Sequence, residues 1–113
     1  MYLGIPHTWI GYLVILLTAA RFIQLLATQP RNEPAKGKAI GSIASGLLDL
    51  QALLGIAAMI TGGYPPSWLH PIFGIAGAVL GHVGERQAGI TAKAGSLWWG
   101  LTLLLIVAGL SRM

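Results

Sequence analysis

The sequence predicts an all-α integral membrane protein, built as one four-helix bundle in up-down-up-down order. Hydrophobic residues make up 55% of the 113 residues and charged residues only 9%, whereas a soluble domain normally carries about 25% charged residues. Mean hydropathy is +0.73. The apolar residues fall into four runs, each near the roughly 20 residues that cross a bilayer. We therefore expect one transmembrane domain, 1–113, inserted in the lipid bilayer.

The first two helices are expected at about 5–28 and 39–61. Pro6 falls in the first turn of the earlier helix, where proline is tolerated, and Arg21 interrupts its apolar run. The segment before the first helix has no basic region and no small-residue cleavage site, so we expect a retained helix rather than a signal peptide. A polar, proline-containing loop then leads into the second helix, which carries Asp49.

The last two helices are expected at about 69–87 and 94–111. A turn rich in glycine and proline precedes the third helix, and a polar loop follows it. The fourth helix has no ionisable residue before Arg112. Because short loops make consecutive helices antiparallel neighbours, the expected order is up, down, up, down.

The charges predict how the chain is inserted. The net charge is +4, but the basic residues are dispersed in loops, so we expect no nucleic-acid partner. One side of the membrane receives most of them: Arg31, Lys36, Lys38, Arg86 and Lys93. Since cytoplasmic loops are enriched in Lys and Arg, we expect a multi-pass protein of the bacterial cytoplasmic (inner) membrane with both termini outside the cytoplasm. Cysteine is absent, which excludes disulfides and thiol catalysis.

Two histidines are expected at the outer end of the bundle. His7 lies in the first turn of the first helix and His70 at the start of the third. Two imidazoles at one depth on two helices are the axial ligand set of a b-type haem. Gly11 and Gly74 follow these histidines by one turn and would leave room for the ring. Glycines at this spacing are also typical of close helix packing, and that structural interpretation stays open.

Three polar residues are expected together nearer the cytoplasm. Counting about 1.5 Å per residue, Arg21 lies roughly 21 Å deeper than His7, while Asp49 and His82 each lie roughly 18 Å from the outer face. The simpler interpretation is an Arg21–Asp49 ion pair with His82 as a hydrogen-bonded neighbour. The functional interpretation is a proton or quinone-headgroup site, because Asp and His exchange protons near neutral pH.

Several motifs resemble a family of small four-helix bacterial membrane proteins labelled cytochrome b-like. They are Leu47-Leu48-Asp49-Leu50-Gln51-Ala52-Leu53-Leu54-Gly55, Leu69-His70-Pro71, Gly81-His82-Val83-Gly84 and Leu103-Leu104-Leu105-Ile106-Val107-Ala108-Gly109. The resemblance covers nearly the whole chain and includes His7. The family's Arg-Trp pair about four residues beyond that histidine is replaced here by Gly11-Tyr12. The resemblance implies the four-helix fold and favours haem b as the cofactor.

The sequence thus leads to two functional hypotheses. The first is a membrane-bound b-type cytochrome, or a small cytochrome subunit, that transfers electrons through one bis-histidine haem near the outer face. The competing hypothesis is a haem-free structural subunit of a membrane complex. No nucleophile stands beside a base, so we expect electron transfer rather than a self-contained enzyme. Expected partners are other membrane or redox subunits, or a second copy in a homodimer.

Overall fold

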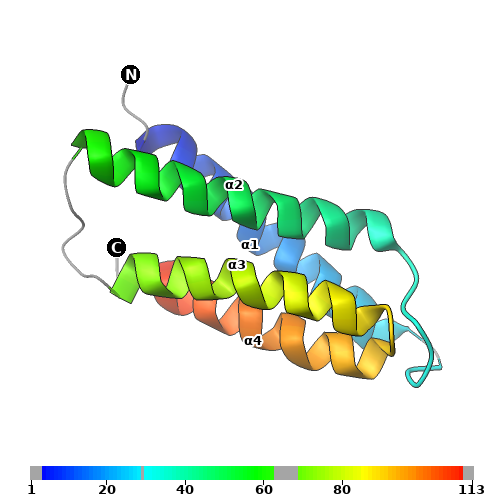
Figure 1. Cartoon of the computed structure of the whole chain (residues 1–113). Helices are drawn as coiled ribbons and strands as arrows, with labels where there is room; N and C mark the ends of the chain where they lie inside the picture. Colours follow the sequence, from blue (N-terminus) through cyan, green and yellow to red (C-terminus); the bar gives the residue numbers. More distant parts are fainter. Residues whose placement is uncertain (1–3, 29, 63–68, 111–113) are drawn as a thin grey trace.

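The described residues of the protein, in a computed structural model, are 4–28, 30–62 and 69–110. They form four α-helices and no strand: α1 (Gly4–Ala27), α2 (Lys38–Gly62), α3 (Leu69–Ala88) and α4 (Ala92–Leu110), as Figure 1 shows. The expected all-helical fold class with four helices is confirmed for this part of the chain. The expected end of the fourth helix at residue 111, and Arg112, lie outside the described residues.

The helix bounds differ from the expected ones by one or two residues, and the reason is clear for α4. The backbone amide of Ala94 donates to Thr91 Oγ1 over 3.1 Å. Thr91 therefore acts as an N-cap that satisfies an otherwise unpaired amide of the first turn. The helix begins at Ala92 rather than 94 because this cap, not the first apolar residue, sets its start.

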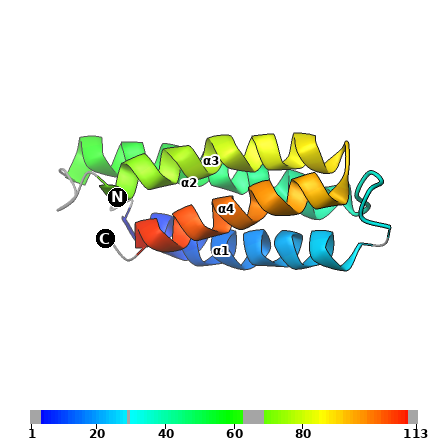
Figure 2. The same ribbon diagram turned by 90° about the horizontal axis from the view of Figure 1, so that it is seen from below.

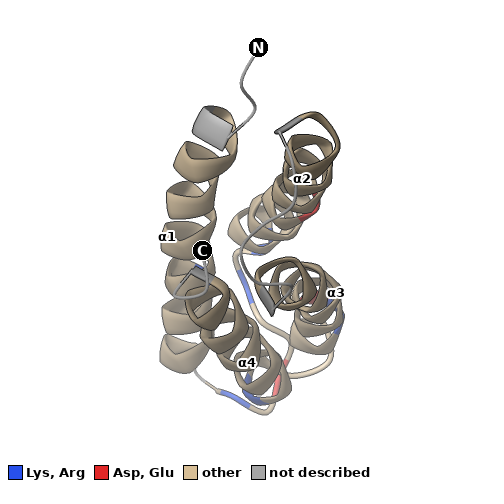
Figure 3. Ribbon diagram, turned by 90° about the vertical axis from the view of Figure 1, so that its left-hand side faces the viewer, with Lys and Arg blue, Asp and Glu red and all other residues tan. Residues whose placement is uncertain are grey.

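The four helices lie in a ring. The packed pairs are α1 with α2, α2 with α3, α3 with α4, and α4 with α1. Seen along the bundle in Figure 3, α1 and α3 are diagonal to each other, and Figure 2 shows all four axes running along the same long direction. The molecule measures 47 × 22 × 17 Å, which matches a bundle one helix length long.

The loop 28–37 packs onto the connection between α3 and α4. The amides of Ala35 and Ala92 donate to the carbonyls of Ala88 and Glu33, each over 2.8 Å. The Arg31 guanidinium donates to Ser96 Oγ over 2.6 Å. The two connections therefore form one end of the bundle, and we call it the loop end.

The core is centred on Trp99 of α4, which is completely buried. The glycines of α3 make room for it: a Cβ added at Gly84 would lie 3.0 Å from Trp99 Cδ1, and one at Gly81 would lie 2.6 Å from Leu48 Cδ1. The glycine stripe of α3 thus packs against side chains of its own chain at these positions. This packing brings α3 and α4 close together.

The surface of the bundle is apolar on every helix. Trp9, Ile60, Ile72 and Leu97 are examples, with 55% to 80% of each residue exposed. Three helical segments are long and apolar enough to cross a membrane, namely Pro6–Ala27, Lys38–Thr61 and Ala92–Gly109. α3 is not among them. The helix that carries most of the polar groups is therefore the least apolar one, and it depends on the other three for an apolar environment.

Candidate functional site

Polar side chains of the diagonal helices α1 and α3 meet at two levels of the bundle. The outer level, far from the loop end, contains His7 and His70. The inner level, at the loop end, contains Arg21 and Glu85. Each level also receives a group from α2 and one from α4, so that both connect all four helices.

The outer level brings the two predicted histidines into contact. The ring centroids of His7 and His70 are 5.9 Å apart, with an angle of 87° between the planes. Pro6 and Pro71 adjoin them in the first turns of α1 and α3, where proline costs no intrahelical hydrogen bond. The two imidazoles thus reach each other from helix starts on opposite sides of the ring.

The tautomer of His70 follows from its backbone partner. His70 Nδ1 lies 2.8 Å from the carbonyl oxygen of Gly109. This carbonyl belongs to the last turn of α4, where carbonyls lack an intrahelical partner. Because a carbonyl only accepts, Nδ1 must carry the proton and donate. In the neutral ring Nε2 is then unprotonated, which is the form that ligates a metal.

His7 is held against α2. A Cβ at Gly55 would lie 3.0 Å from His7 Cε1, so only glycine admits the ring at this distance. His7 Nδ1 and Gln51 Oε1 are both buried and have no hydrogen-bond partner among the described residues. Buried polar atoms without partners are uncommon in folded proteins. The outer level therefore has unused capacity to bind a polar group or a metal.

The two glycines predicted to leave room for a haem differ. A Cβ at Gly74 would meet no atom within 4 Å, so space is open beside His70. A Cβ at Gly11 would lie 2.8 Å from Gln51 Nε2. The expectation of an open slot at Gly11 is therefore wrong in this conformation, because the amide of Gln51 fills it.

The inner level is a buried ion pair. Arg21 is 1% exposed, and its Nε and Nη2 donate to the two carboxylate oxygens of Glu85 over 2.7 and 3.1 Å. Arg21 Nη1 donates to Gln24 Oε1 and to the carbonyl of Lys36 over 2.6 and 2.9 Å. Trp99 Nε1 donates to Glu85 Oε1 over 3.2 Å. Such a bidentate, fully hydrogen-bonded pair compensates the desolvation of both charges.

This geometry corrects the expected Arg21–Asp49 ion pair: Arg21 is paired with Glu85, and Asp49 with His82. Asp49 Oδ2 lies 2.7 Å from His82 Nε2, and the two side chains are 49% and 56% exposed. The predicted inner cluster of Arg21, Asp49 and His82 is therefore two separate pairs, one buried and one on the surface. The depth count placed Asp49 wrongly because it took the ends of the helices to be level.

The register of α2 shows the size of that error. Gly55 of α2 contacts His7 of the outer level, whereas Gly41 faces Glu85 of the inner level. Asp49 lies between them, six residues from Gly55 and eight from Gly41. At about 1.5 Å per residue it is thus near the middle of the bundle.

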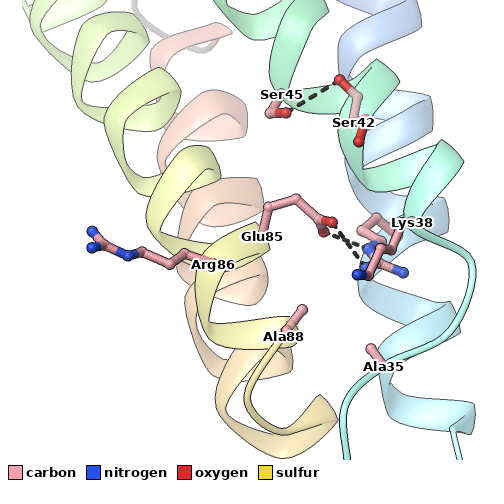
Figure 4. Close-up of a pocket in the computed structure, with 9 residues that line it drawn as sticks. Ala35, Lys38, Ser42, Ser45, Glu85, Arg86 and Ala88 are labelled. Atoms are coloured by element: carbon pink, nitrogen blue, oxygen red, sulfur yellow. Dashed lines mark hydrogen bonds and ion pairs between the residues drawn. The ribbon is translucent and has the colours of Figure 1, made fainter.

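A pocket of about 380 Å³ opens beside the inner ion pair. Figure 4 shows Glu85 reaching into it and Arg86 pointing away. The carboxylate of Glu85 is engaged by Arg21 and Trp99, so the pocket offers no unpaired acid. Its lining residues are Arg21, Ala35, Lys38, Ser42, Ser45, Glu85, Arg86, Ala88 and Gly89.

Sequence reasoning missed three groups at these levels: Glu85, Gln51 and the Gly109 carbonyl. A signal for Glu85 was present, since it lies 15 residues beyond His70 while Arg21 lies 14 beyond His7. Glu85 was assigned to a loop because the apolar run ends at Gly84. The structure extends α3 to Ala88, which places Glu85 inside the helix. No sequence pattern marks the Gly109 carbonyl.

Among the described residues there is no group of three or more His, Cys, Asp or Glu side chains that could hold a metal ion. The histidine pair therefore offers two protein ligands. Comparison of the chain with protein-family models, with curated proteins and with solved structures found no match. The functional argument accordingly rests on the geometry of the two levels.

Proposed function

We propose that the chain is a membrane-bound b-type cytochrome, or a small cytochrome subunit, with His7 and His70 as the axial ligands of one haem. The observation that carries the proposal is the contact between these rings. Two imidazoles bound to one metal at about 2 Å have centroids roughly 6 Å apart, and the centroids of His7 and His70 are 5.9 Å apart.

Three features of the outer level support this ligand assignment. The Gly109 carbonyl fixes the tautomer of His70 that leaves Nε2 as an acceptor. His7 Nδ1 is buried without a partner. Space is open at Gly74. Haem b held in this way supplies reversible one-electron transfer. The residues of this chain orient the imidazoles and exclude water, and the Gln51 side chain has to move from Gly11 when a ring occupies that side.

The proposal includes the topology of the chain. We infer an up-down-up-down bundle that crosses the cytoplasmic membrane four times, with the loop end in the cytoplasm. The basic residues of that end support this orientation, and α3 crosses within the apolar surround of the other three helices. The histidine pair then lies near the outer face, where an external redox partner can approach it.

The visible spectrum of the purified protein tests the function. The chain is expressed with ample haem supply and purified in detergent, and spectra are recorded oxidised and after dithionite. We expect a Soret band and sharp α and β bands on reduction, as low-spin bis-histidine haem gives. A colourless protein would contradict the proposal and favour the haem-free structural subunit.

A further inference from the structure

The Asp49–His82 pair lies on the outer surface of the bundle, between α2 and α3. The two side chains are about half exposed and are hydrogen-bonded over 2.7 Å. Asp49 lies 11 residues into the 25-residue helix α2, which is roughly 16 Å from its start. In a membrane this is the hydrocarbon region, where ionisable side chains are found facing protein or water and not lipid.

The exposed surfaces of α1 and α4 differ from this one. Their exposed large side chains within the apolar spans are hydrophobic, as at Leu16 and Leu104, each 65% exposed. Lipid can cover such surfaces without cost. The surface of α2 and α3 therefore requires a protein cover, and those of α1 and α4 do not.

The same surface of α2 also permits close approach of another helix. Ser42, Gly46, Asp49 and Leu53 follow one another at spacings of four, three and four, so they lie along one face. A Cβ at Gly46 would meet no atom within 4 Å. Small residues at such positions let membrane helices pack backbone to backbone.

We infer that the face of α2 and α3 around Asp49 and His82 is buried against a second copy of this chain. The pair is self-complementary, because an acid and an imidazole stand side by side at one depth. A two-fold axis along the membrane normal preserves depth, so Asp49 of each copy meets His82 of the other. The result is a ring of four alternating partners closed off from lipid. The inference rests on the proposed membrane insertion and is independent of the haem.

Single-cysteine variants test this interface, since the chain has no cysteine. Leu53→Cys lies on the α2 face and Leu16→Cys on α1, and the native side chains are equally exposed at 64% and 65%. The purified full-length variants are reconstituted in vesicles at high lipid excess and oxidised with copper phenanthroline. We expect a several-fold higher yield of disulfide-linked dimer from Leu53→Cys than from Leu16→Cys. Equal yields, or no dimer from either, would overturn the interface.

A second variant links the dimer to the polar pair. In the Leu53→Cys background, Asp49→Ala removes the acid of each copy, and the dimer yield should fall several-fold. An unchanged yield would show that the pair does not hold the copies together. Flotation of the vesicles and resistance to carbonate extraction are recorded first. A chain lost at that stage would overturn the membrane insertion as well, which distinguishes failure of the proposed topology from failure of the interface.

Discussion

The carboxylate of Glu85 is what allows a fully buried arginine at the centre of the loop end. Arg21 donates to both oxygens of this carboxylate, to a side-chain amide and to the loop carbonyls of Lys36 and Gly37. Gly37 has φ +75°, and a Cβ there would collide with the side chain of Gln24. Glycine is required because the left-handed backbone turns the carbonyls toward the guanidinium.

Glu85→Gln should destabilise the folded protein strongly. The variant leaves the Arg21 guanidinium buried without a counter-charge, and removing one partner of a buried pair costs about 3–5 kcal/mol. Asp49→Asn is the matched control, because an exposed pair contributes about 0–1 kcal/mol. The free energy of unfolding in detergent, from SDS titration followed by circular dichroism, compares the two. Equal losses would contradict the assignment of Glu85 as the partner of Arg21.

At the scale of the helix, α3 combines a packing stripe with most of the polar groups. Gly77, Gly81 and Gly84 face Ile106, Leu48 and Trp99, while His70 and Glu85 of the same helix face α1. A helix with this content has few large apolar side chains left for lipid. Its polar groups are therefore satisfied within the bundle, except at His82.

Gly81→Ala should weaken the packing of α3. Its Cβ would lie 2.6 Å from Cδ1 of the buried Leu48, and overpacking of this kind costs about 1–3 kcal/mol. Gly74→Ala is the control, since its Cβ would meet nothing and alanine favours a helix by about 0.5–1 kcal/mol. Thermal unfolding of both variants in detergent measures the difference. If Gly81→Ala were as stable as Gly74→Ala, the close packing against Leu48 would be refuted.

Helix existence and approximate bounds follow from the apolar runs, but the pairing of polar residues does not. Equal counting from the starts of α1 and α3 placed His7 near His70, and the same count applied to Glu85 pairs it with Arg21. It fails for Asp49 because α2 is 25 residues long and α3 only 20, so their ends are not level. The filling of Gly11 by Gln51 depends on helix rotation, which apolar runs do not encode.

At the scale of the whole molecule, the polar groups divide the bundle into three levels. The histidine pair is at one end, the buried ion pair is at the loop end, and the exposed Asp49–His82 pair lies between them on one side. The first level is the proposed redox centre, the second holds the helices and both connections together, and the third is the proposed contact with a second copy. Each level is separated from the next by apolar layers.

The orientation of the molecule is testable because the chain has no cysteine. We expect Thr61→Cys, exposed near the far end of α2, to react with a membrane-impermeant maleimide in intact spheroplasts. Lys93→Cys, exposed at the loop end, should react only after lysis. The reverse pattern would contradict the proposed orientation, and labelling of both in intact spheroplasts would contradict membrane insertion.

The reduced visible spectra of His7→Leu and His70→Leu test the central claim most directly, with His82→Gln as the control on the same helix as His70. The proposed axial ligation predicts that both leucine variants lose the low-spin six-coordinate spectrum, because each removes one of the two ligands. The control should keep it, since His82 is paired with Asp49 on the surface. A leucine variant with an unchanged low-spin six-coordinate haem would contradict the assignment of His7 and His70 as the redox centre.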